Sequence, residues 1–204
     1  DPMPPITTVI FDIGHVLFQW DPRFLFEKLI DNPEELDWFL GNVVTKDWHF
    51  QADTGRPLAL MLEERIAEFP DHEELIRAYA ERWNETVPGP ICGSHEIVRE
   101  LSGRGVPLYA ITNFGHEFWA GFRPEQPIFD LFADILVSGT EKLMKPDAAI
   151  YALAIERFGV DPAASLFIDD RIENVRAAEA AGMHGHVFQD AETLRAELER
   201  MGLL

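Results

Sequence analysis

Apolar residues along the chain follow two different spacings, and each spacing predicts a different kind of element. Short, almost continuous apolar runs that end on polar residues predict buried strands. Residues spaced three or four positions apart predict amphipathic helices. The predicted strands are 7–11, 106–111, 135–137, 165–168 and a weaker one at 186–188, and the helices between and after them are 94–104, 147–159, 171–181 and 191–201.

Strands that alternate with helices in this way are typical of an α/β protein with a Rossmann-like parallel sheet and helices on both faces. The alternation is interrupted after the first strand, because apolar residues keep helical spacing over residues 18–90, with turn-forming residues between the stretches. An insertion of this length cannot stay a structureless loop in a compact domain. We therefore expect an α/β core domain from residues 1–17 and 88–204, and a helical domain from residues 18–87.

The charge of the chain limits its partners. The 204 residues include 17 Lys and Arg against 36 Asp and Glu, which gives a formal net charge of −19. Such a surface repels nucleic acid and anionic membranes, because phosphate binding needs clustered Lys and Arg. No apolar run approaches the roughly 20 residues of a membrane helix. The single cysteine, Cys92, excludes an intrachain disulfide and fits a cytoplasmic protein, while a monomer and a homodimer both remain open.

Polar side chains follow three of the predicted strands. Asp12 follows the first strand, Thr112 and Asn113 follow the second, and Asp169 and Asp170 follow the fourth. The carboxyl ends of parallel strands share one edge of a sheet, so these groups are expected to meet there. Two carboxylates about 4 Å apart repel by roughly 4 kcal/mol at an effective dielectric of 20, so the cluster needs a cation. All-oxygen ligation of this kind suits Mg²⁺.

Two more residues are candidates for the same edge. Gly14 allows a tight turn directly after Asp12, so that its carbonyl can face the acids. Lys145 lies just before a predicted helix, in a loop that can project inward. An ammonium group there can neutralise an acyl- or phospho-aspartate during attack, although a lone lysine is more often a surface residue.

The ordered set resembles the motifs of the haloacid dehalogenase-like hydrolase superfamily over nearly the whole chain. The residues that carry the resemblance are Asp12, Thr112, Lys145-Pro146 and Asp169-Asp170, with the helical insertion after the first strand. The resemblance implies that the insertion is a cap over the active site. It also implies a Mg²⁺-dependent phosphatase that hydrolyses a small phosphorylated metabolite through an aspartyl-phosphate intermediate.

One branch of the superfamily is most similar. Residues 11–17, and Asn113 with Trp119 downstream, resemble the sugar-phosphate phosphatases and the phosphatase domain of soluble epoxide hydrolase. A sugar phosphate is therefore one candidate substrate. Trp48 and its aromatic neighbours in the cap are candidates for stacking on the substrate or excluding water, with packing inside the helical domain as the alternative.

The resemblance also implies a catalytic role for three residues. Asp12 would be the nucleophile that attacks phosphorus. Thr112, together with Asn113, would hold a phosphoryl oxygen. Lys145 would bridge Asp12 and the phosphoryl group. These roles describe covalent catalysis by an activated carboxylate.

The metal site that the resemblance implies includes Gly14, the one position where the sequence departs from the motif of the superfamily's phosphatases. Mg²⁺ would be held by Asp12, the Gly14 carbonyl and Asp170, with Asp169 acting directly or through water. Phosphatases of this superfamily usually carry a second Asp at the position of Gly14, where it serves as general acid and base. Losing such a group typically costs about 10²–10⁴ in rate. His15 is a candidate substitute proton donor.

Two other function classes remain open because of Gly14. The 2-haloacid dehalogenases of the superfamily also lack the second Asp, use no metal and displace halide with the same aspartate. They would need an arginine for the substrate carboxylate, for which Arg23 and Arg56 are candidates, whereas Asp169-Asp170 would place unneeded negative charge beside it. A regulatory or binding protein with a degraded site is the third class.

Overall fold

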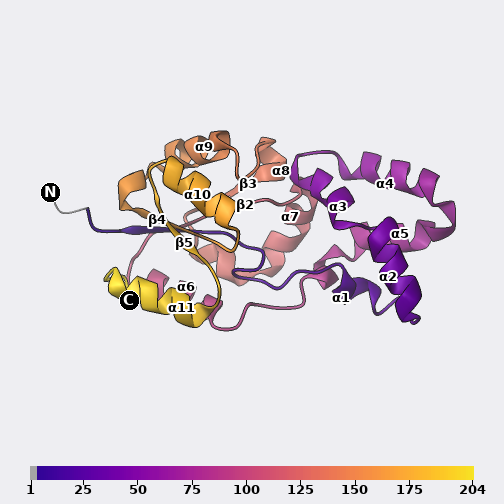
Figure 1. Ribbon diagram of the computed structural model, residues 1–204, viewed down its shortest axis with the longest axis horizontal. Coiled ribbons are helices and arrows are strands. Elements are labelled where there is room, and N and C mark those ends of the chain that lie inside the picture. Colours follow the sequence, from indigo (N-terminus) through magenta and orange to yellow (C-terminus); the bar gives the residue numbers. More distant parts are fainter. Residues whose placement is uncertain (1–3) are drawn as a thin grey trace.

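The computed structural model describes residues 4–204 and contains one sheet of five parallel strands with helices on both faces (Figure 1). The strand order is β3-β2-β1-β4-β5, so that β1 lies at the centre between β2 and β4. The strands are β1 (Thr8–Phe11), β2 (Leu108–Thr112), β3 (Asp134–Val137), β4 (Ser165–Asp169) and β5 (His184–Val187). The predicted α/β fold is confirmed.

Side chains of β1 alternate between two hydrophobic cores, as a strand buried on both faces requires. Val9 and Phe11 point into one core and Ile10 into the other. Helices α9 (Ala148–Phe158) and α10 (Ile172–Ala180) cover the Ile10 face. On the opposite face lie α6 (Ser94–Gly103) and α11 (Ala191–Arg200), as Figure 1 shows.

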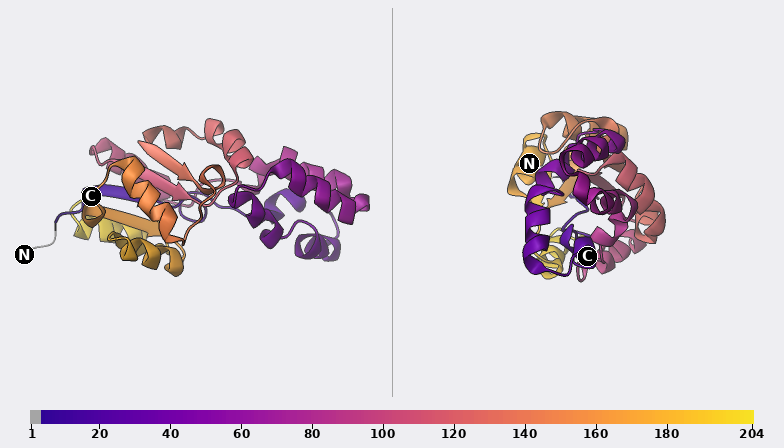
Figure 2. Two further views of the ribbon diagram at one scale, coloured as in Figure 1. Left: turned by 90° about the horizontal axis from the view of Figure 1, so that it is seen from above. Right: turned by 90° about the vertical axis from the view of Figure 1, so that its right-hand side faces the viewer.

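The residues between β1 and α6 form helices that gather at the end of the molecule away from both termini (Figures 1 and 2). Polar side chains start two of them: Asn32 accepts from the backbone N–H groups of Glu34 and Glu35, and Thr45 accepts from that of Trp48. The helices are α1 (Arg23–Phe26), α2 (Pro33–Asn42), α3 (Lys46–Asp53), α4 (Leu58–Glu68) and α5 (Glu73–Glu81), with 3₁₀ turns at Pro70–His72 and Trp83–Thr86.

Two short helices of the α/β part lie next to the inserted helices. They are α7 (His116–Phe122), which follows β2, and α8 (Ser138–Glu141), which follows β3. The Ser138 hydroxyl donates to the backbone oxygen of Asp53 at 2.6 Å and accepts from the backbone N–H of Phe114 at 3.0 Å. This hydroxyl therefore ties the end of α3 to the segment that follows β2.

The remaining turns complete the chain without changing the layers. They are the 3₁₀ segments Arg123–Glu125, Pro127–Leu131 and Pro162–Ala164. Over residues 4–204, each helix is too short or too polar to cross a bilayer.

Candidate active site

Asp12 lies at the carboxyl end of the central strand. Its backbone N–H donates to the oxygen of Ile168 at 2.8 Å, which continues the pairing of β1 with β4 by one residue. Its carboxylate Oδ1 accepts from the backbone N–H of Ile13 and from Lys145 Nζ, both at 2.8 Å. The side chain is held in one direction by these bonds, and it lines a cavity at this edge of the sheet.

Lys145 connects Asp12 with the end of β4. Its Nζ donates to Asp12 Oδ1 and to Asp169 Oδ2, each at 2.8 Å, and the residue is only 4% exposed. Burial alone would lower the pKa of Lys145, but the two carboxylates outweigh it and raise the pKa above its ordinary value. The ammonium group therefore stays charged beside Asp12.

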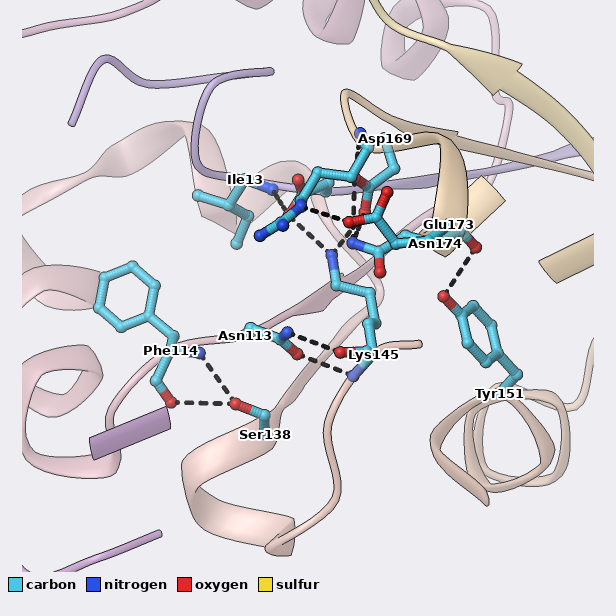
Figure 3. Close-up of polar contacts among 11 residues, drawn as sticks. Ile13, Asn113, Phe114, Ser138, Lys145, Tyr151, Asp169, Glu173 and Asn174 are labelled. Atoms are coloured by element: carbon cyan, nitrogen blue, oxygen red, sulfur yellow. Dashed lines mark hydrogen bonds and ion pairs between the residues drawn. The ribbon is translucent and has the colours of Figure 1, made fainter. Parts of the chain in front are cut away.

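Asn113 holds the backbone of this lysine. Its side-chain amide donates to the Lys145 carbonyl at 3.0 Å, and its side-chain oxygen accepts from the Lys145 N–H at 2.9 Å (Figure 3). Both ends of the amide are used, so the side chain positions Lys145 while it also forms part of the cavity wall.

Asp169 is completely buried and its oxygens already have several donors. Oδ1 accepts from the Arg171 N–H at 2.9 Å, and the Asn174 amide donates to both oxygens at 3.2 and 3.1 Å. Tyr151 in turn donates to the Asn174 carbonyl at 2.8 Å. Asp169 therefore acts mainly as the buried anchor of Lys145 (Figure 3).

The three acids predicted to meet at this edge do so. One oxygen each of Asp12, Asp169 and Asp170 lies within 4.8 Å of the others. Burial raises the pKa of Asp12 well above its ordinary value, Lys145 opposes this, and Asp169 and Asp170 add to it. Burial likewise raises the pKa of Asp170. One ammonium group against three carboxylates leaves an excess of negative charge, which a divalent cation would remove.

The donor set fits a hard cation. Carboxylate and carbonyl oxygens are the ligands that Mg²⁺ prefers. Asp12 and Asp170 line the cavity, and Gly14 lies on the same wall with open space on the side where a Cβ would be. Asp169 contributes its charge, with most of its hydrogen-bonding capacity already used by Lys145 and Asn174.

The cavity above these acids has a volume of about 520 Å³. Polar groups from the end of the sheet form its floor, and aromatic and apolar side chains form most of the remaining wall. The aromatic and apolar lining residues are Ile13, Phe18, Trp20, His49, Phe50, Trp83, Val87, Phe114, Phe122, Met144 and Pro146.

Two residues predicted for the site are not on this wall. Thr112 ends β2 at the correct edge but is 1% exposed and does not line the cavity. Trp48 turns into the helical bundle, where its ring lies 4.9 Å from that of Tyr79 and 5.3 Å from the Arg65 guanidinium. For Trp48 the structure thus has the alternative of packing inside the helical domain, whereas its neighbours His49 and Phe50 line the cavity.

His15 lies on the cavity wall, in the turn after Asp12. It is exposed and has a left-handed backbone conformation with φ of 63°. Its ring lies 6.0 Å from that of Trp20. The structure therefore brings His15 to the mouth of the site, on the same side as Asp170.

The two arginines considered for a substrate carboxylate are engaged elsewhere. Arg23 pairs with Asp37 at 2.7 Å, and Arg56 pairs with Glu64. Neither is among the cavity-lining residues, where the arginine present is Arg171, paired with Glu173 at 2.8 Å. From the inserted helices, the cavity wall receives the positively charged side chain of Lys46, at the start of α3.

A buried acid on the cavity wall was not among the residues predicted from the sequence. Asp53, the last residue of α3, is 4% exposed and lines the same cavity as Asp12 and Lys145. The sequence shows only that His49 and Asp53, four residues apart, share one face of a helix, and it does not show that this face is buried.

Comparison with known proteins gives one family. The sequence model described as "haloacid dehalogenase-like hydrolase" matches residues 6–182. A sesquiterpene phosphatase, astK of Aspergillus oryzae, is 30% identical over 199 residues, which covers 94% of each chain. A phosphoglycolate phosphatase of Pseudomonas syringae pv. tomato is 35% identical over 53% of this chain and 39% of its own length.

Solved structures share the fold at low identity. A HAD family enzyme of Bacteroides thetaiotaomicron, in complex with magnesium and inorganic phosphate, superposes with a TM-score of 0.69 at 22% identity, covering 91% of this chain and 95% of its own. L-2-haloacid dehalogenase of Xanthobacter autotrophicus gives 0.62 at 17%, covering 98% and 84%. At these identities the likeness concerns the fold.

Proposed function

The chain belongs to the haloacid dehalogenase-like hydrolase family, and we propose that it is a Mg²⁺-dependent phosphatase acting on a small phosphate monoester with an apolar organic group. The observation that carries the proposal is the buried Lys145 ammonium held between Asp12 and Asp169 on the floor of a cavity with aromatic walls. The relatives named as phosphatases support the reaction class.

In the proposed reaction, Asp12 attacks phosphorus and forms an aspartyl-phosphate, which water then hydrolyses. Lys145 balances the negative charge that gathers on the phosphoryl oxygens. Asn113 keeps the lysine backbone in place, and Asp169 keeps its ammonium group facing Asp12. Thr112, buried at the end of β2, remains the proposed partner of a phosphoryl oxygen.

Asp12, Asp170 and the Gly14 carbonyl would hold Mg²⁺, with Asp169 beside them. The ion supplies charge neutralisation and a template for the phosphate when it is bound. An ionised Asp12 is the nucleophile, and because burial raises the pKa of Asp12, added positive charge favours the reactive form. Magnesium in the related Bacteroides enzyme supports this choice of metal.

The walls favour an apolar leaving group over a sugar. A polyol needs hydrogen-bond partners for each hydroxyl group when it is desolvated, because unpaired polar groups are costly to bury. Rings of Trp20, Phe50, Trp83 and Phe114 instead offer apolar contact area. The full-length similarity to a sesquiterpene phosphatase supports an alkyl or prenyl phosphate.

We propose residues 18–87 as the cap domain and residues 1–17 with 88–204 as the core domain. The cap supplies Trp20, His49, Phe50, Asp53 and Trp83 to the cavity, whereas the core supplies Asp12 and Lys145. The cap would thus choose the substrate while the core carries the chemistry. A cytoplasmic location and a monomeric or dimeric state stay predictions from the sequence.

A substrate panel tests this proposal. We expect phosphate release from a prenyl phosphate and from n-decyl phosphate, with kcat/KM about 10–100-fold above that for hexose phosphates, as apolar pocket contacts allow. Asp12→Asn should release no phosphate. Higher kcat/KM for hexose phosphates would overturn the apolar assignment. Halide release from 2-chloropropionate without phosphatase activity would identify a dehalogenase. Absence of both activities, with no thermal shift from beryllium fluoride and Mg²⁺, would identify a degraded site.

A further inference from the structure

We propose that Asp53, at the end of α3, is the general acid and base of this enzyme and replaces the carboxyl group that Gly14 lacks. The inference rests on the proposed phosphatase function. It assigns to the inserted helices a chemical role in addition to substrate choice.

The position of Asp53 is built into the fold. The residue lines the cavity whose floor carries Asp12 and Lys145. Its own backbone oxygen accepts from the Ser138 hydroxyl at 2.6 Å, and Ser138 also accepts from the Phe114 N–H. The end of α3 is thereby tied to the segments that follow β2 and β3.

The Asp53 side chain has no structural partner to explain its burial. Within residues 4–204, its Oδ1 is buried and makes no hydrogen bond. The nearest candidate, His49 Nε2, lies 3.9 Å away, which is beyond hydrogen-bond distance. A buried carboxyl oxygen without a partner is destabilising, so this burial points to a role in binding or proton transfer.

The groups around Asp53 keep it from being an ordinary ion pair. Burial lowers the pKa of His49, on the same helix, to about 3, so this imidazole is neutral. His49 Nδ1 lies 2.6 Å from the hydroxyl of Tyr79 on α5, whose pKa burial raises, so the phenol is also neutral. Lys145, from the loop before α9, is the charged group that acts on Asp53 from the core.

The resulting acidity suits proton transfer near neutral pH. Burial raises the pKa of Asp53 to about 7, and Lys145 opposes the rise. A carboxyl group with this pKa carries a proton in about half of the molecules at pH 7, and a catalytic acid works best when its pKa is near the operating pH.

The location also matches where a proton is needed. In an in-line displacement the leaving oxygen points away from the nucleophile. With Asp12 on the floor, the leaving oxygen faces the inserted helices, and Asp53 lies on the part of the wall that these helices form.

The proton balance of the cycle is complete. Asp12 forms a bond to phosphorus, the bond to the ester oxygen breaks with its electron pair on that oxygen, and protonated Asp53 gives its proton to form the alcohol. Ionised Asp53 then takes a proton from the water that attacks the aspartyl-phosphate. Inorganic phosphate leaves, and Asp12 and protonated Asp53 are regenerated.

Leaving-group dependence tests the proposal. The kcat/KM value covers steps up to cleavage of the ester bond, and p-nitrophenolate leaves without help whereas an alkoxide does not. We expect Asp53→Asn to lower kcat/KM about 10²–10⁴-fold for n-decyl phosphate and less than about tenfold for p-nitrophenyl phosphate. Asp47→Asn, an exposed acid on the same helix, is the matched control and should change neither value.

Equal loss on both esters, or no loss on either, would overturn the proposal. If the Asn variant does not fold, wild-type enzyme decides the question. With n-decyl phosphate, kcat/KM should fall as the pH rises above about 7, because Asp53 loses the proton that it donates. With p-nitrophenyl phosphate this fall should be absent. Wild-type enzyme that hydrolyses neither ester would refute the phosphatase function itself. Wild-type activity on both esters with identical pH profiles would refute only the role of Asp53.

Discussion

Lys145 Nζ lies 2.8 Å from Asp12 Oδ1, and both side chains are nearly inaccessible to solvent. The two residues are 133 positions apart in the sequence and meet because β1 and the loop before α9 end at the same edge of the sheet. The same ammonium group is also 2.8 Å from Asp169. Lys145 therefore holds together the acids at the ends of β1 and β4, which are the groups proposed to carry out the reaction.

Removing this ammonium group should affect stability as well as activity. Breaking a buried ion pair costs about 3–5 kcal/mol, because the partner is left uncompensated. We expect Lys145→Met to lower the free energy of unfolding by an amount in this range at pH 8 in EDTA, measured by urea denaturation. The loss should become smaller as the pH is lowered, because burial raises the pKa of Asp12 and favours its neutral form, which needs no ammonium partner.

Lys28→Met is the matched control for this variant. Lys28 forms a half-exposed pair with Glu85 at 3.0 Å, and such surface pairs contribute about 0–1 kcal/mol. Equal destabilisation by the two substitutions would show that Lys145 is not a buried, charged partner of the acids.

The aromatic wall should control the choice of substrate. Trp20 packs 4.9 Å from His49 on the cavity wall. We expect Trp20→Ala to reduce kcat/KM for n-decyl phosphate about 10–100-fold, since apolar contacts of this size contribute about 1–3 kcal/mol, and to leave the value for acetyl phosphate nearly unchanged. Trp38→Ala, an exposed tryptophan on α2, is the control. A similar loss on both substrates would indicate a structural role for Trp20.

Restoring the missing acid beside the nucleophile is sterically possible. A Cβ placed on Gly14 meets no atom within 4 Å, and its backbone does not require glycine. In the Asp53→Asn background, we expect Gly14→Asp to recover at least about tenfold in kcat/KM for n-decyl phosphate, because a general acid is again present. The double variant should match Asp53→Asn in its thermal stability. Absence of any recovery in kcat/KM would count against the idea that Asp53 does the work of an acid at position 14.

The buried carboxyl of Asp53 should also appear in the pH dependence of stability. Its pKa is raised to about 7 in the folded protein, so the protonated form stabilises the fold at low pH and that contribution is lost as pH rises from about 4 to 7. Relative to wild type, Asp53→Asn should therefore gain stability with a slope approaching about 1.4 kcal/mol per pH unit over this range. Denaturant titrations at pH 5, 6 and 7 measure this, and a constant difference would refute the raised pKa.

His15, the sequence-based candidate for the proton donor, provides a contrasting variant. The residue is exposed in the turn after Asp12, whereas Asp53 is buried on the facing wall. We expect His15→Gln to keep both limbs of the pH–rate profile of wild type. Loss of one limb would return the proton-transfer role to His15.

Much of the floor of the site was predictable because sheet geometry is simple. Parallel strands share a direction, so acids placed directly after β1 and β4 had to meet at one edge, and Asp12, Asp169 and Asp170 do. The fold class followed from the same alternation of spacings. The fifth strand begins two residues earlier than predicted, at His184. Gly185 interrupts the run of apolar side chains that would predict a strand there. A glycine is needed because α10 packs so close that a Cβ would lie 2.4 Å from Val175.

The wall of the cavity was much less predictable. Adjacent helical residues differ in direction by about 100°, so the sequence could not show which of Trp48, His49 and Phe50 face the cavity and which packs inside the helical domain. Asp53 was missed because a helix-terminal acid is normally a solvated residue. Only the packing of α3 against α8 shows that this acid is enclosed.

Metal dependence of phosphate release is the most direct test of the central claim that the acids at this edge form a magnesium-dependent phosphatase site. The initial rate with n-decyl phosphate should fall to background in EDTA, return when excess Mg²⁺ is added, and stay at background in Asp170→Asn at low Mg²⁺. Phosphate release that continues undiminished in EDTA would contradict the account.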